Sequence, residues 1–146
     1  MSTKKSWILI ITAVALMLGF ALFLSNPKRQ MRNYVLSHKS ELDSYAEECL
    51  SQPLPYRGSY DGYVTEVFAE HPGILLIHWS AYGLVPSGGY CDLLYATDGA
   101  PHPYPGMEDY EEYDQMFNWR WVQPDGDNGC SVENIDGNWY YCKAWF

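Results

Sequence analysis

The sequence predicts an α+β fold: an N-terminal transmembrane helix, an amphipathic helix, and then a small antiparallel β-sheet domain. Eighteen residues from Trp7 to Leu24 carry no charge. A stretch without Gly or Pro then runs from Lys28 to Gln52, with apolar residues at steps of three and four. After Pro53, short runs rich in Tyr, Trp, Val and Ile alternate with Gly, Pro, Asp and Asn, as in strands and turns. We therefore divide the chain into a short N-terminal tail (1–6), a transmembrane anchor (7–25), an amphipathic helix (26–52) and an antiparallel β domain (53–146).

The apolar run from Trp7 to Leu24 predicts a signal-anchor. At 1.5 Å per residue a helix of this length extends about 27 Å, which is enough to cross the hydrocarbon core of a bilayer. A cleaved signal peptide is the alternative, but its apolar region is usually shorter and ends at small residues. Here the run ends in Phe23, Leu24, Ser25 and Asn26, a poor cleavage site. We expect the segment to remain attached.

Charge and cysteine content predict the orientation of the anchor. Two lysines precede the run and three basic residues follow it closely, so the positive-inside rule gives a tie. Residues 33–146 contain four basic residues against all eighteen acidic ones, a net charge of −14, and also all four cysteines. An even cysteine count behind an export signal favours an oxidising compartment. We expect a single-pass protein of the plasma membrane with its C-terminal domain outside the cytoplasm.

The segment after the anchor predicts a helix with one apolar stripe. Asn26 suits the cap and Pro27 the first turn. The stripe comprises Met31, Tyr34, Val35, His38, Leu42, Tyr45, Ala46 and Cys49. Such a helix is about 36 Å long. It is either a stalk or a cover for the sheet, and we expect docking, because a lone helix gains little stability in water.

Six strands are expected in the β domain, at Gly62–Ala69, Ile74–Tyr82, Gly89–Ala96, Phe117–Val122, Ser131–Ile135 and Asn138–Trp145. The start of the second run, ILLIHW, is nearly all apolar, which is typical of a central strand covered on both faces. Asp136-Gly137 is the best hairpin turn in the chain. Residues Ala100 to Asp114, with three prolines and several acids, are expected to form a solvated surface loop.

Four cysteines are candidates for two disulfides, Cys130–Cys142 and Cys49–Cys91. The chain contains no CxxC, so neither a zinc finger nor thioredoxin-type chemistry is supported. A two-residue turn at Asp136-Gly137 would place Cys142 opposite Ser131, whereas a three-residue turn would place it opposite Cys130. Both turns are open to this sequence. The alternative to disulfides is four free, buried thiols.

Composition excludes some function classes and leaves others open. The net charge of −9 argues against nucleic-acid binding, which needs clustered basic residues. We assign no catalytic residue, no metal ligand and no cofactor, because neither the histidines nor the serines form a known motif. Carboxylates are plentiful enough that a pair at glycosidase distance would arise by chance.

The aromatic residues, 16% of the chain, are the one positive indication of function. In the last strand Trp139, Tyr141, Lys143 and Trp145 share one face. Lys143 should meet solvent, so Trp139, Tyr141 and Trp145 are expected to form an exposed row that contacts a ligand or partner. The function expected is an extracytoplasmic binding or interaction module for a cell-surface or membrane-protein partner. The alternatives are a small cell-envelope hydrolase with paired carboxylates and a structural subunit of a membrane complex.

Two short motifs carry a resemblance to a group of proteins. Gly83-Leu84-Val85-Pro86-Ser87, with a tyrosine-rich run after it, and the terminal WYYxxxWF from Trp139 to Phe146 resemble segments of uncharacterised small membrane-anchored proteins of Gram-positive gut bacteria. The resemblance covers about half of the chain and implies a membrane anchor but no activity, ligand or site residue. In that group aromatic residues often stand where this chain has Cys91, Cys130 and Cys142, so the resemblance weakens the support for disulfides as a family trait.

Overall fold

The computed structural model describes residues 3–24, 26–84, 87–99, 101, 111–114, 118–123 and 128–146. Within them, two helices precede one antiparallel sheet of eight strands, so the α+β class is confirmed. The elements are α1 (Thr3–Leu24), α2 (Pro27–Leu50), β1 (Tyr56–Tyr60), β2 (Tyr63–Val67), β3 (Ile74–Leu84), β4 (Ser87–Ala96), β5 (Glu111–Asp114), β6 (Asn118–Val122), β7 (Gly129–Asp136) and β8 (Trp139–Trp145). The strand order is β1-β2-β3-β4-β8-β7-β6-β5, so β8 returns to the middle of the sheet.

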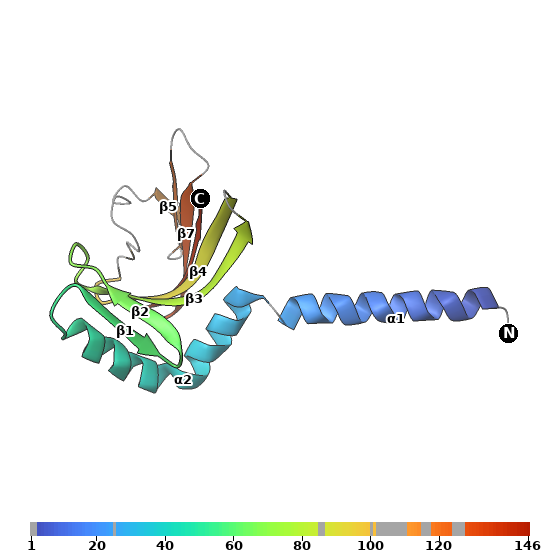
Figure 1. Cartoon of the computed structure of the whole chain (residues 1–146), viewed down its shortest axis with the longest axis horizontal. Coiled ribbons are helices and arrows are strands. Elements are labelled where there is room, and N and C mark those ends of the chain that lie inside the picture. The colour runs from blue at the N-terminus through green and yellow to red at the C-terminus, as the bar shows by residue number, and fades with distance from the viewer. Residues whose placement is uncertain are drawn as a thin grey trace.

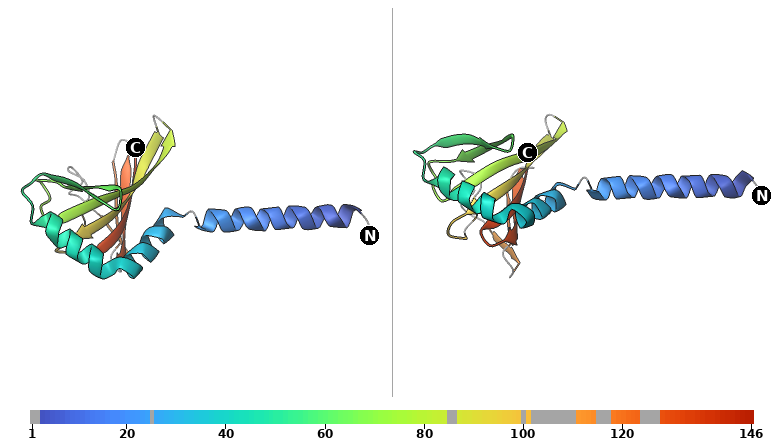
Figure 2. Two further views of the ribbon diagram at one scale, coloured as in Figure 1. Left: turned by 60° about the horizontal axis from the view of Figure 1, so that its bottom comes forward. Right: turned by 90° about the horizontal axis from the view of Figure 1, so that it is seen from below.

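Helix α1 extends away from the rest of the molecule (Figures 1 and 2). Its described side chains between Trp7 and Met17 are exposed, although most of them are apolar. Over the residues that the structure describes, no helix has the length and apolarity needed to span a bilayer. Ser25, the last residue of the expected anchor, lies outside the described residues. The domain beside α1 consists of α2 and the strands of the sheet.

Helix α2 lies across one face of the sheet, as expected for a docked helix (Figure 2). The cap is the one predicted, because Asn26 Oδ1 accepts a hydrogen bond from the Arg29 N–H at 3.4 Å. The helix bends at His38, whose φ of −123° and ψ of 19° are not helical. Its buried side chains are Met31, Val35, Leu42, Ala46 and Cys49, all members of the predicted stripe.

The sheet is buried on both faces. One apolar cluster packs between α2 and the sheet and includes Val67, Leu75, Ile77, Leu93, Trp139 and Tyr141. The other packs on the opposite face and includes Ile74, Leu76, Leu94, Val132, Tyr140 and Cys142, with Trp119 and Trp121 against it. Consecutive residues of β3 thus enter different clusters. This explains why the run from Ile74 to Ile77 has no polar position, and it confirms the predicted central strand.

Two strands at the edges of the sheet were not predicted. β1 contains Gly58 within YRGSY and has no apolar alternation. A Cβ at Gly58 would lie 2.3 Å from the Tyr56 hydroxyl, so the tyrosine ring occupies the space that a side chain would fill. β5 is the acidic segment EEYD, inside the stretch expected to be loop. Charge on an edge strand discourages pairing with other chains, so these residues are compatible with an edge. Ala100 and residues 102–110 of that stretch lie outside the described residues, as does Phe117 of the fourth expected strand.

The register of the β7–β8 hairpin differs from both predicted alternatives. Cys142 lies opposite Val132, and Cys130 lies opposite Ala144. A bulge between Asn134 and Asp136 adds one residue to β7, and the chain turns at Gly137, whose φ is +57°. Cys130 and Cys142 consequently share a face as diagonal neighbours rather than as a directly opposed pair.

Candidate functional site

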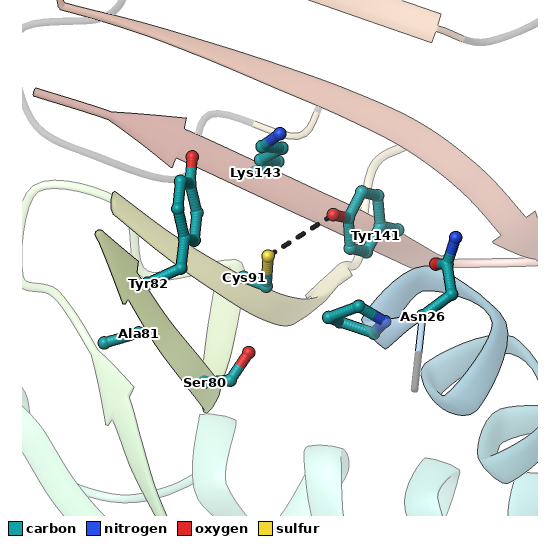
Figure 3. Close-up of a pocket in the computed structure, with 8 residues that line it drawn as sticks. Asn26, Ser80, Ala81, Tyr82, Cys91, Tyr141 and Lys143 are labelled. Atoms are coloured by element: carbon teal, nitrogen blue, oxygen red, sulfur yellow. Dashed lines mark hydrogen bonds between the residues drawn. The ribbon is translucent and has the colours of Figure 1, made fainter. Parts of the chain in front are cut away.

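A cavity of about 600 Å³ lies between the start of α2 and strands β3, β4 and β8 (Figure 3). Asn26 and Pro27 form its wall on the helix side. The sheet side is formed by Ser80, Ala81, Tyr82, Cys91, Tyr141 and Lys143. This volume lies in the range of about 300–1,000 Å³ that is usual for small-molecule sites. The cavity is therefore our candidate functional site.

Strand pairing brings the polar lining residues into one row. Ser80 of β3 lies opposite Cys91 of β4, and Cys91 lies opposite Lys143 of β8. A bulge between His78 and Ser80 shifts the register of β3 at this point. This row lies on the same face of the sheet that α2 covers. The helix begins at the rim of the cavity, and the part of the face that it covers lies further along the strands (Figure 3).

Tyr82 is held over a glycine. It pairs with Gly89, where a Cβ would lie 2.5 Å from the Tyr82 hydroxyl and 2.1 Å from the carbonyl oxygen of Ala144. The Tyr82 hydroxyl donates a hydrogen bond of 2.8 Å to that carbonyl. The ammonium of Lys143 lies 5.1 Å from the centroid of the Tyr82 ring, within the range of a cation–π contact. Because Gly89 has no side chain, the Tyr82 ring can lie against the backbone there and contact the Lys143 ammonium.

The phenols of the cavity are neutral at physiological pH. Burial raises the pKa of Tyr82 above its usual value of 10. Burial, and next its contact with Cys91, raises the pKa of Tyr141 much further. The Tyr141 hydroxyl lies 3.3 Å from Cys91 Sγ, the bond drawn in Figure 3. Lys143 is consequently the one formal charge among the side chains that line the cavity.

A second polar cluster lies on the opposite face of the sheet and is composed of Arg57, Glu66, His78 and Asp92. His78 lies 3.2 Å from Asp92 Oδ1 through Nδ1 and 2.9 Å from Glu66 Oε2 through Nε2. Arg57 Nε lies 3.4 Å from the other oxygen of Glu66. The bond to Asp92 is the main reason that the pKa of His78 is raised to about 9.

The two carboxylates of this cluster are one counterpart, among the described residues, of the expected hydrolase pair. A protonated imidazole between them forms an ion network, in which both carboxylates already have partners. Such a network stabilises the fold, whereas a catalytic carboxylate pair needs room for substrate between its members. The cluster therefore gives no support to hydrolase chemistry.

The expected exposed aromatic row is not present, which corrects the sequence prediction. Trp139 is fully buried and Tyr141 is 7% exposed, both beneath α2, and Trp145 is half-buried. The reason is that α2 covers the part of this face where Trp139 and Tyr141 lie, whereas the Trp145 ring lies against Gly129, 2.2 Å from the position of a Cβ there. Lys143 is exposed as predicted, because α2 begins beyond it. The sequence prediction placed Lys143 correctly in solvent, but it wrongly extended this exposure along the strand to Trp139 and Tyr141.

All four cysteines are buried, and in the described structure they form no disulfide. The Sγ atoms of Cys130 and Cys142 are 3.4 Å apart. Cys91 contacts Tyr141, and Cys49 contacts Tyr45. Cys130 and Cys142 are thus brought together as expected, although through a different register, whereas the pairing of Cys49 with Cys91 stays a prediction.

Sequence reasoning did not find the cavity. Ser80 and Tyr82 stand in a run read only as a strand, and Cys91 was considered only as half of a disulfide. The available signal was the Gly88-Gly89 pair, since glycine within a strand often marks the close approach of another group.

Comparison with known proteins adds nothing to this geometry, because no family, curated protein or solved structure matches the chain.

Proposed function

We propose that this chain is a single-pass, membrane-anchored binding module whose domain lies outside the cytoplasm and whose ligand site is the cavity at the start of α2. The observation that carries the proposal is the position of that cavity. Pro27, part of its wall, is three residues beyond Leu24, the last residue of α1. Three residues span at most about 11 Å, so a membrane that held α1 would bring its surface close to the cavity.

The anchor itself is supported by the sequence. The run from Trp7 to Leu24 has no charged residue, and its described part projects away from the domain as a helix. Large side chains such as Ile8, Leu16 and Met17 are each at least 64% exposed. So many exposed apolar side chains on one helix are unfavourable in water and are stabilised in a lipid environment.

A two-part labelling experiment tests anchoring and orientation. The full chain should remain in the membrane fraction after extraction with alkaline carbonate. A Ser59→Cys variant should react with a membrane-impermeant maleimide on intact cells, because Ser59 is an exposed residue of β1. The matched Ser2→Cys variant should react only after lysis. Release by carbonate, or the reverse labelling pattern, would contradict the proposal, and the wild-type chain with its buried thiols gives the background.

A further inference from the structure

We propose that the cavity takes the phosphate-bearing headgroup of an anionic membrane lipid, with Lys143 as the counter-ion. This inference rests on the proposed function and names the ligand class of the same site. It depends on three features of the cavity: a cation without a carboxylate partner, neutral polar groups beside it, and an opening next to the anchor.

Lys143 has no acidic partner, unlike three other basic residues of the domain. Lys28 pairs with Glu133, Lys39 with Asp136, and Arg57 with Glu66. Among the described residues, no carboxylate oxygen lies within 4.0 Å of the Lys143 ammonium, which rests on the Tyr82 ring instead. Residues 33–146 carry a net charge of −14, so anions are repelled from most of their surface. An unpaired ammonium at a cavity marks the place where an anion is accepted.

The neighbours of Lys143 can share the negative charge of a phosphate. The Ser80 hydroxyl lines the cavity and is free to donate a hydrogen bond, since within the described part of the chain no partner is seen for it. Hydrogen bonds to a charged acceptor are stronger than neutral ones. Tyr82 and Tyr141 stay neutral because burial raises the pKa of each phenol, so they do not repel the anion. A single ammonium with one hydroxyl donor, that of Ser80, fits a monoanionic phosphodiester.

The position of the cavity favours a lipid over a soluble phosphate compound. The wall residues Asn26 and Pro27 follow directly on the expected anchor. A headgroup in the same membrane is therefore present at high effective concentration, which compensates for a site with only one cation. Tyr82 is 38% exposed, so its ring offers an apolar surface to the glycerol part of a headgroup.

Native mass spectrometry of the full chain in dodecyl maltoside tests the inference. Equal amounts of phosphatidylglycerol and phosphatidylcholine are added, and the lipids retained are counted. We expect wild type to retain phosphatidylglycerol about fivefold better, the effect of one partly exposed ion pair. Lys143→Gln should abolish this preference. Lys39→Gln is the matched control. Lys39 lies further along α2, where it pairs with Asp43 and with Asp136 of β7, so its replacement should not change lipid retention.

Two further arms separate the possible failures. Glycerol phosphate bound as tightly as phosphatidylglycerol would overturn the lipid source, and equal retention of both lipids by wild type would overturn the anionic headgroup. Ser80→Trp fills the cavity, because the Ser80 side chain lies on the same face as Cys91 and Lys143. If both lipids are retained equally but are lost in Ser80→Trp, the headgroup class is wrong and the binding cavity stands. If Ser80→Trp retains lipid as wild type does, the cavity itself is not the site and the proposed function fails with the inference.

Discussion

The indole Nε1 of Trp139 donates a hydrogen bond of 2.8 Å to Asp43 Oδ1, which joins β8 to α2. Trp139 is fully buried, and its ring meets the edge of Tyr95 with centroids 4.9 Å apart. One residue of the expected binding surface is therefore part of the contact that holds the helix on the sheet.

Replacement of Trp139 should cost stability rather than binding. We expect Trp139→Ala to lower the free energy of unfolding by about 3–5 kcal/mol, as is typical for a buried Trp. Trp139→Phe retains most of the packing but leaves Asp43 without the indole N–H, and it should cost less. Chemical denaturation of both variants measures the difference. A Trp139→Ala variant as stable as wild type would show that α2 is not docked through this residue.

The ion network around His78 predicts that stability depends on pH. The pKa of His78 is raised to about 9 in the folded state, chiefly by Asp92, and it is about 6.5 when unfolded. The stabilisation is therefore fully present below about pH 6.5 and is lost as the pH rises through about 9. Thermal melts of wild type should show a fall in Tm between pH 6.5 and 9.5 that is smaller in His78→Gln. Equal falls in the two proteins would mean that the imidazole is not held in its charged form.

Gly89 provides a test of how the cavity is built. A Cβ at this position would lie 2.1 Å from the Ala144 carbonyl oxygen, which is backbone and cannot move freely. Gly89→Ala should destabilise the domain by about 1–3 kcal/mol, the usual cost of overpacking. Gly19→Ala is the control, because nothing lies within 4 Å of a Cβ there. An unfolding midpoint unchanged by Gly89→Ala would show that the tyrosine does not lie over this glycine.

The cysteines are predicted to differ in their chemistry. If the domain lies in an oxidising compartment, Cys130 and Cys142 should form a disulfide, because their sulfurs are already 3.4 Å apart. In reduced protein, the contact with Cys130 and burial raise the pKa of the Cys142 thiol, so it should react slowly with maleimide until the protein unfolds. Peptide mapping after acid quench checks the first expectation. Four free thiols in protein taken from the membrane would contradict the disulfide and weaken the extracytoplasmic assignment.

The elements with a strong apolar pattern could be predicted from the sequence. The stripe of α2 and the continuous run of β3 follow directly from helical and strand periodicity, and both are found. β1 and β5 could not be predicted, because one depends on a tyrosine folded over Gly58 and the other is an acidic edge. Such strands are specified by their neighbours and not by their own pattern.

The site could not be predicted for a similar reason. Its residues come from β3, β4, β8 and the start of α2, and no local motif connects them. The error over Trp139 and Tyr141 arose because strand alternation gives the face of a side chain but not which part of that face a helix covers. Only Lys143 was placed correctly, since an unpaired lysine is seldom buried.

Site-specific photo-crosslinking in cells tests the central claim most directly, that the cavity beside the anchor is a ligand site. The full chain is made with benzoylphenylalanine in place of Tyr82, whose ring lines the cavity, or in place of Ser44, an exposed residue of α2 that does not. After irradiation of intact cells, mass spectrometry of the purified chain gives the mass of any adduct. We expect a lipid adduct from position 82 in the membrane fraction and none from position 44. No adduct at position 82, or the same adducts at both positions, would contradict the account.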